Sequence, residues 1–324
     1  AAMSGANDRE SMKATAWLRL GVTVATLLVP TAPTLAQVSP LAALPWRNLG
    51  PANMGGRIVD IEAVERDFKR VYLATASGGV FRSVNAGTTW EPVFERYRSA
   101  SIGDMAIFQP DPRIVWVGTG EANNRNSVAW GDGIYKSTDG GTRFERMGLE
   151  ATQQIARVLT HPRDPDAVLA CAIGPLWAEG GQRGLFATTD GGRTWRQLGG
   201  GLPNDGKTGC TDLVRDPRDP AVLYAAFYQR LRRPWTFSSG GPNGGIFKSA
   251  DGGASWKKLS AGLPPGPTGR IGLAVATSRP GVIMALVEAV RSDNLAQPGS
   301  GVYRSEDAGV TWRYLNTYNN RPFY

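Results

Sequence analysis

A twelve-residue pattern recurs five times along this chain, and the repeat limits the possible folds more than any other feature. The copies begin at Gly79, Gly133, Gly184, Gly245 and Gly301, and each reads G-x-[FY]-x-[ST]-x-[DN]-x-G-x-x-[WF]. The intervals between the first Ser or Thr of successive copies are 54, 51, 61 and 56 residues. A period near 50 residues is typical of a propeller or a solenoid.

Three other short segments keep the phase of this repeat. Each unit has a strand-like segment and an apolar run such as "RIVWVGTG", most with a Pro-containing turn between them, and another strand-like segment follows the repeated pattern. Four strands per unit predict an all-β fold, a β-propeller of four-stranded antiparallel blades. We expect five blades within a propeller at 46–324, as part of a larger ring, with the next blade beginning at 317–324. The blades are expected near residues 56–95, 100–148, 153–199, 208–260 and 268–316.

The repeated pattern itself is expected to be a structural turn between the third and fourth strands. Its Asp can accept hydrogen bonds from nearby backbone N–H groups, the Gly two residues later permits positive φ, and the closing aromatic residue can be buried. The further acidic ligands of a calcium loop and the GK[ST] of a phosphate loop are missing, so we expect no metal here. The structural positions are Asn85, Asp139, Asp190, Asp251 and Asp307, and Trp90, Phe144, Trp195, Trp256 and Trp312.

The N-terminal segment resembles a secretory signal. After an unassigned leader at 1–11, residues 12–36 combine a positively charged start, an apolar run at 20–29 and a small-x-small pattern before Gln37. The run is too short to span a membrane. We therefore expect a signal peptide at 12–36, a linker at 37–45, and a secreted protein without a membrane span once the signal is removed.

Composition excludes several classes of site. The net charge of +8 is spread along the chain, so nucleic-acid binding is not expected. The single histidine, His161, excludes a two-histidine metal site and argues against a Ser-His-Asp triad. No cofactor is expected. Cys171 and Cys210 are consistent with a disulfide in an exported protein and equally with two buried thiols.

The repeated pattern resembles the Asp-box, or BNR repeat. Stretches such as "GPANMGGRIVDI" and "VWVGTGEANNRNSVAWGDGIYKSTDGG" extend the resemblance to large secreted bacterial proteins with a sortilin-type propeller, often described as glycosyl-hydrolase-like. Xyloglucanase-type enzymes are also similar in the first blade, where their pattern reads T-D-V-G-G. Their catalytic carboxylate corresponds here to Ala76, and this departure argues against inherited glycosidase chemistry.

Recognition is expected on the face formed by the loops between the second and third strands, because these loops are long and differ from blade to blade. They carry aromatic, arginine and polar side chains suited to protein, peptide or glycan ligands. For the segment from Glu121 to Asp132, an equal alternative is a structural loop whose Asn and Asp side chains hydrogen-bond to the loop's own backbone. The candidate ligand-binding residues are Glu121, Asn123, Arg125, Trp130, Asp132, Trp177, Tyr228, Arg230, Arg232 and Trp235.

The innermost strands supply a second, catalytic hypothesis. Their aligned positions are Asp60, Asp104, Arg157, Asp212 and Leu273, so three carboxylates are expected to face the channel. A pair at suitable spacing could hydrolyse a glycosidic bond, whereas a charged channel balanced by Arg157 is the structural alternative. The sequence favours a non-catalytic sortilin-like recognition module that binds an extracellular protein, peptide or polysaccharide. An extracellular glycoside hydrolase is the alternative, and the oligomeric state is left open.

Overall fold

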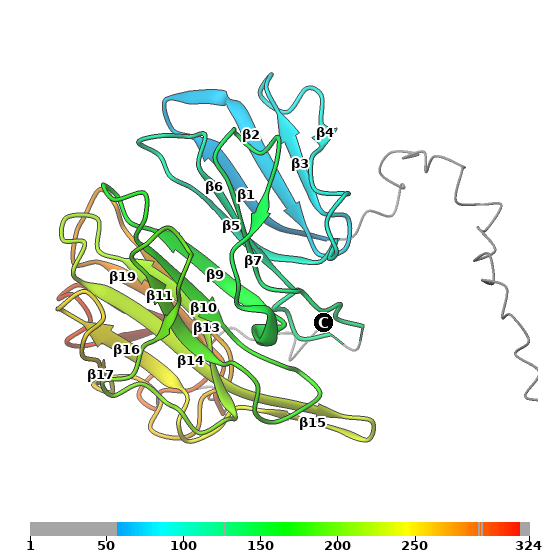
Figure 1. The fold of residues 1–324 in the computed structure, drawn as a ribbon. Helices are drawn as coiled ribbons and strands as arrows, with labels where there is room; N and C mark the ends of the chain where they lie inside the picture. The colour runs from blue at the N-terminus through cyan, green and yellow to red at the C-terminus, as the bar shows by residue number, and fades with distance from the viewer. Residues whose placement is uncertain (1–56, 126, 291, 293, 318–324) are drawn as a thin grey trace, which may run out of the picture. The chain divides into compact units, whose positions relative to one another are not determined.

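Five antiparallel sheets follow one another along the chain in the computed structural model, from the blue to the red end of the ribbon (Figure 1). The structure describes residues 57–125, 127–290, 292 and 294–317. Four of the sheets have four strands in sequence order, and the fourth sheet along the chain carries one additional strand. This arrangement confirms the predicted all-β fold with four-stranded antiparallel blades.

The strands of each blade pair with their neighbours along the chain. Blade 1 contains β1 (Ile58–Val64), β2 (Asp67–Thr75), β3 (Val80–Ser83) and β4 (Glu91–Pro92). Blade 2 contains β5 (Ile102–Ile107), β6 (Val115–Thr119), β7 (Ile134–Ser137) and β8 (Glu145–Arg146). A single 3-10 turn, η1 (Glu150–Thr152), precedes blade 3, which contains β9 (Ile155–Thr160), β10 (Val168–Ala172), β11 (Gly184–Thr188) and β12 (Arg196–Gln197).

The last two blades follow the same order. Blade 4 contains β13 (Thr208–Arg215), β14 (Leu223–Arg233), β15 (Thr236–Ser239), β16 (Gly245–Ser249) and β17 (Lys257–Lys258). Blade 5 contains β18 (Ile271–Val275), β19 (Ile283–Val287), β20 (Gly301–Ser305) and β21 (Arg313–Asn316).

Each hydrophobic cluster lies between two consecutive blades. The cluster around Tyr72 and Met105 joins blades 1 and 2, for example, and the cluster around Tyr224 and Tyr303 joins blades 4 and 5. Every residue of β6 and β10 is buried, because these blades are covered on both faces. The outer faces of blades 1 and 5 instead expose apolar side chains, with Ile61 at 57% and Leu286 at 63%.

The repeated turns form the expected hydrogen bonds. In blade 2 the Asp139 carboxylate accepts hydrogen bonds from the N–H groups of Thr142 and Arg143, both at 2.9 Å, and from Ser137 Oγ at 2.8 Å. Ser137 Oγ in turn accepts the N–H of Gly141, which has a φ of 79°. The other four copies repeat the bond from the first Ser or Thr hydroxyl to the Asp or Asn oxygen.

The closing aromatic residue is buried in most blades but not in the first. Phe144, Trp256 and Trp312 are buried, whereas Trp90 is 39% exposed. Where it is covered, this residue lies against the preceding blade. Trp195, for example, donates from Nε1 to Met147 O and meets Trp116 edge-on. No described blade precedes blade 1, so the expectation that Trp90 is buried is wrong among the described residues.

The sequence suggested a loop from Tyr228 to Gly245, but part of this segment forms two paired strands. β14 continues to Arg233, turns at Pro234 and Trp235, and pairs with β15 from Arg230↔Ser239 to Arg233↔Thr236. The chain therefore forms a hairpin that extends beyond the body of blade 4 (Figure 1). Proline is tolerated because it lies at the turn, where no ladder hydrogen bond is required.

A disulfide joins Cys171 of β10 to Cys210 of β13, and so links blades 3 and 4. This resolves the alternative between a disulfide and free thiols. The leader at 1–11, the signal peptide at 12–36, the linker at 37–45 and the segment 318–324 lie outside the described residues. These assignments stay predictions, as do the limits of the propeller at 46–324 and the larger ring.

Candidate active site in the propeller channel

A backbone irregularity precedes the channel residue in four of the five innermost strands. The strand register shifts between Ile58 and Asp60 in β1, between Ile102 and Asp104 in β5, and between Cys210 and Asp212 in β13. In β9 the shift precedes Arg157. A bulge re-aims the side chain that follows it. Blade 5, which carries Leu273 at this position, keeps a regular register.

Each of the three aspartates ties its own blade to the next one along the chain. Asp60 Oδ2 accepts the N–H of Met105 at 3.2 Å, Asp104 Oδ2 accepts that of Val158 at 2.7 Å, and Asp212 Oδ2 accepts that of Leu273 at 2.7 Å. Each of these carboxylates therefore satisfies a backbone donor in the innermost strand of the following blade. Two of them are buried, which makes such bonds costly to lose.

Arg157 joins two of these carboxylates. Its Nη1 lies 3.0 Å from Asp104 Oδ1 and its Nε lies 3.0 Å from Asp212 Oδ1. With a backbone N–H on each carboxylate as well, Asp104 and Asp212 are engaged in structural contacts. Among the candidates Asp60, Asp104 and Asp212, only Asp60 makes no described ion pair.

Burial raises the pKa values of two channel acids, Asp60 and Asp104. Burial raises the pKa of Asp60 and raises that of Asp104 well above its usual range, although Arg157 opposes both shifts. Asp104, in turn, raises the pKa of Arg157, so the guanidinium stays charged. The channel thus holds more carboxyl groups than balancing cations. This excess of acidic groups favours retention of a proton by the carboxyl groups.

Glu62 is the channel-side acid that sequence reasoning missed. Burial, assisted by the negative charge of Asp60, raises its pKa to about 7. Asp60 and Glu62 pair across the ladder with Ala74 and Tyr72, two residues of the cluster between blades 1 and 2. Both acids therefore share the face of β1 that is turned toward blade 2. The alternation in "IVDIEAV" could have revealed this, since residues two apart share a face.

The loops between the second and third strands contain buried as well as exposed candidates. Glu121 is only 2% exposed and forms an ion pair with Arg57. Arg230 is 1% exposed and donates to Ala122 O at 3.0 Å and to Asn124 Oδ1 at 2.7 Å. Tyr228 is fully buried, and its hydroxyl accepts a hydrogen bond from Asn124. These contacts hold the loops together, which fits the alternative of a loop bonded to itself. The assignment of Glu121, Tyr228 and Arg230 to ligand binding stays a prediction.

Several other candidates do present polar contacts or open surface. Asn123 accepts a hydrogen bond from Arg270 Nη1 at 2.7 Å, and Asp132 accepts one from the Tyr135 hydroxyl at 2.7 Å. Arg232 lies over the ring of Phe237 at 4.4 Å. Arg125 is partly buried. Three large aromatic side chains are exposed on this set of loops: Trp130, Trp177 and Trp235.

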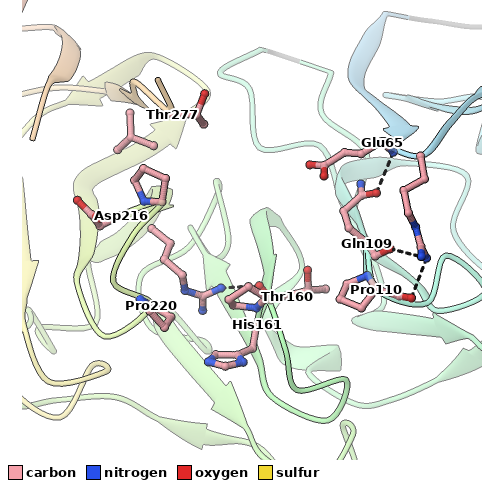
Figure 2. Close-up of a pocket in the computed structure, with 13 residues that line it drawn as sticks. Glu65, Gln109, Pro110, Thr160, His161, Asp216, Pro220 and Thr277 are labelled. Carbon is pink, nitrogen blue, oxygen red and sulfur yellow. Dashed lines mark hydrogen bonds between the residues drawn. The ribbon is translucent and has the colours of Figure 1, made fainter. Parts of the chain in front are cut away.

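Two cavities border the innermost strands. A small one of about 90 Å³ is lined by Asp104, Arg157, Asp212 and Arg270, on the side of the long loops. A larger one of about 590 Å³ lies among the first turns of all five blades, between residues such as Glu65 and Thr277 (Figure 2). The larger cavity is within the size range of small-molecule sites. No group of three or more His, Cys, Asp or Glu side chains that could hold a metal ion occurs in the described ranges.

Comparisons with known proteins identify sequence relatives of this chain. A xyloglucanase from Paenibacillus sp is 24% identical over 301 residues, which cover 86% of this chain and 23% of that protein. Xyloglucanase Xgh74A from Acetivibrio thermocellus is 23% identical and is matched over 79% of this chain and 32% of its own length. The chain is a β-propeller that is similar in sequence to these xyloglucanases. It spans only about a quarter to a third of the length of these relatives.

Solved structures agree on the fold. The crystal structure of an ancestral GH74 enzyme matches with a TM-score of 0.61 and 19% identity, over 83% of this chain and 32% of that one. The GH74 xyloglucanase from Xanthomonas campestris matches with a TM-score of 0.57 and 18% identity, over 78% and 38% of the two chains. No family model matches the chain.

These relatives overturn the functional expectation from the sequence. A non-catalytic sortilin-like recognition module and a protein that is not an enzyme were expected, and the xyloglucanase relatives contradict both. Ala76 was given too much weight, because one missing carboxylate does not exclude chemistry by others. The relatives support the glycoside hydrolase alternative, and give no support to the sortilin-type or Asp-box relationship. Within the described part of the chain, no helix is long and apolar enough to cross a membrane.

Proposed function

We propose that this chain forms part of an extracellular glycoside hydrolase that acts on a polysaccharide of the xyloglucan class. The similarity to xyloglucanases over more than three quarters of the chain carries the proposal. The chain spans less than two thirds of the length of those relatives. The activity and the substrate of the whole protein are therefore our proposal and are not transferred from the relatives.

Glu62 and Asp60 are the proposed acid and base. Hydrolysis with inversion needs a protonated acid and an ionised base about 6.5–9.5 Å apart, with room for a water molecule between them. The Cα atoms of residues two apart on a strand are about 6.6 Å apart, and this spacing is compatible with such a pair of carboxyl groups. A pKa of about 7 lets Glu62 keep its proton near neutral pH and donate it to the leaving oxygen.

Asp60 is the better partner because, unlike Asp104 and Asp212, it makes no described ion pair. Its carboxylate accepts the N–H of Met105 at Oδ2 and a further backbone N–H from Ile61. Asp104 and Asp212 are bound by Arg157 and by backbone donors, and we assign them to the stability of the channel. Ala76 is buried at the end of β2 and takes no part in this scheme.

The exposed tryptophans are proposed to bind the polysaccharide chain. Trp235 is 78% exposed at the turn of the β14–β15 hairpin, and Trp177 belongs to a loop whose Leu176 O accepts the N–H of Arg232 at 2.8 Å. This bond joins the two loops into one surface. Aromatic rings on such a surface can stack on sugar rings while their side chains cost little ordering entropy.

Two finer assignments accompany this function. We assign the five repeated turns to the Asp-box type, supported by the conserved geometry of their Ser/Thr–Asp/Asn hydrogen bonds. We also propose secretion, supported by the Cys171–Cys210 disulfide, which suits an oxidising compartment.

The test is a reducing-sugar assay of the purified chain on xyloglucan, with cellulose and a neutral mannan as comparison substrates. We expect Glu62→Gln and Asp60→Asn to lower kcat by at least about 100-fold, in line with loss of acid–base catalysis. Glu91→Gln is the matched control, because Glu91 is exposed and contacts Arg82 away from the channel. Trp235→Ala is expected to raise KM with little effect on kcat. Wild-type activity in both channel variants would refute the assignment.

A further inference from the structure

The larger cavity contains a cation without a counter-ion. Arg215, at the end of β13, is partly buried, and its guanidinium makes one described hydrogen bond, from Nη1 to Thr160 O. Its Nε is buried without an acceptor, and Nη2 has no partner among the described residues. No carboxylate among the residues at 57–317 that the structure describes lies within ion-pair distance. Burial of a charge without a partner is costly, and proteins normally pair it.

The neighbouring acidic side chains do not act as counter-ions for Arg215. Asp216 lines the same cavity, but its Oδ1 accepts the N–H groups of Arg218 and Asp219 and so stabilises its own turn. Glu65 lines the opposite side, beside Arg66, which donates to Gln109 O and Pro110 O (Figure 2). Burial alone lowers the pKa of Arg215 to about 10, so the group remains charged near neutral pH.

His161 supplies a second donor beside Arg215. Its Nδ1 accepts the N–H groups of Arg163 and Asp164 at 3.3 and 3.1 Å, so in the neutral ring the proton is on Nε2. Nε2 makes no hydrogen bond to a described residue. Burial and the charge of Arg215 lower the pKa of this imidazole, which keeps it neutral as a donor.

We propose that the cavity among the first turns of the blades binds an oxyanion through Arg215 and His161. The volume of about 590 Å³ exceeds what a single anion requires, so the ligand carries a larger body. Four prolines and Val275 contribute to the wall and present apolar surface to that body. A carboxylated sugar and a phosphorylated small molecule share this chemistry. This anion site shares no residue with the proposed acid–base pair, Glu62 and Asp60, so it can be tested separately from the proposed function.

The single histidine of the chain makes a site-specific probe possible. The imidazole Cε1–H signal of the untagged chain is followed by NMR at pH 8, where the ring is neutral. Inorganic phosphate, glucuronate and glucose are titrated separately at constant ionic strength. We expect a saturable shift with phosphate or with glucuronate and none with glucose. Tighter binding of glucuronate identifies a carboxylated sugar, and tighter binding of phosphate identifies a phosphoryl group.

Variants assign the binding to the proposed cation. Arg215→Gln is expected to weaken the anion at least tenfold, and Arg215→Lys to weaken it less. Arg113→Gln is the matched control, since Arg113 is exposed and paired with Asp111. If Arg215→Gln does not fold, competition between phosphate and glucuronate on the wild-type protein replaces it. Non-saturable shifts, equal shifts with glucose, or additive rather than competitive binding would overturn the proposal.

Discussion

Arg157 Nη1 lies 3.0 Å from Asp104 Oδ1, and this ion pair joins the innermost strands of blades 2 and 3. Because Arg157 also reaches Asp212 at 3.0 Å, one guanidinium connects three consecutive blades. Asp104 is 2% exposed, so it depends on this cation more than a surface carboxylate would.

Arg157→Met is therefore expected to lower the free energy of unfolding by about 3 kcal/mol, because it leaves a buried carboxylate without its cation. Chemical denaturation followed by tryptophan fluorescence measures this change. Arg157→Met combined with Asp104→Asn should recover part of the loss. Arg113→Met, at an exposed pair with Asp111, serves as the control and should cost under about 1 kcal/mol. Equal effects at the two arginines would contradict the assignment.

Asp139→Ala is expected to lower the melting temperature, because three described hydrogen bonds to the carboxylate are lost. Asp139→Asn should have a much smaller effect. The chain itself supports this, since Asn85 Oδ1 makes the equivalent contacts with Ser83 Oγ and the N–H of Thr89 in blade 1. Differential scanning calorimetry compares the two variants. An Asn variant as unstable as the Ala variant would show that charge, rather than the acceptor oxygen, holds the turn.

Ala308→Gly is expected to stabilise the chain by about 0.5–1 kcal/mol. Ala308 has a φ of 57°, a left-handed conformation that costs an L-residue more than it costs glycine. Gly140, Gly191 and Gly252 occupy the equivalent position in three sister turns and all have positive φ. Urea unfolding measures the change, with Ala254→Gly, one position beyond the glycine pair of the blade 4 turn, as the control. A loss of stability in Ala308→Gly would show that flexibility of the unfolded chain dominates.

The stability contribution of Glu62 is expected to depend on pH. Its pKa is about 7 in the folded chain and about 4.3 when unfolded, so the folded state binds the proton more tightly. The stabilisation from protonated Glu62 is complete below about pH 4.3 and is lost as the pH rises to about 7. The difference in unfolding free energy between wild type and Glu62→Gln, measured from pH 4 to 8, should follow this curve. A difference independent of pH would contradict the raised pKa.

Much of the fold could be predicted from the sequence, because the repeated pattern marks the same position in every blade. The pattern from Gly133 to Phe144 and its sister copies locate the turn between third and fourth strands, and the remaining strands keep the same order around it in every blade. The channel residues Asp60, Asp104 and Asp212 follow from the same alignment. Their partners do not, because the hydrogen bond from Met105 to Asp60 joins residues 45 apart and depends on how two blades pack.

The recognition loops were predicted less well for a related reason. Arg230 and Tyr228 resemble exposed binding residues by type, but their burial depends on the loop at 121–124, more than 100 positions away. Pro234 and the polar residues around it suggested a loop, whereas they form the turn and ladder of a hairpin. The pKa of Glu62 likewise depends on burial and on Asp60, which composition alone does not reveal.

The bonds from each channel aspartate to the following blade give the array a direction, and this limits which blades can be exchanged. Blades 1, 2 and 4 each contribute an acceptor to the next blade, whereas blade 3 contributes Arg157, which serves the blades on both sides. A copy of blade 2 placed in the position of blade 3 would bring aspartates together without a cation. Replacement of blade 3 therefore requires the blades on both sides to change with it.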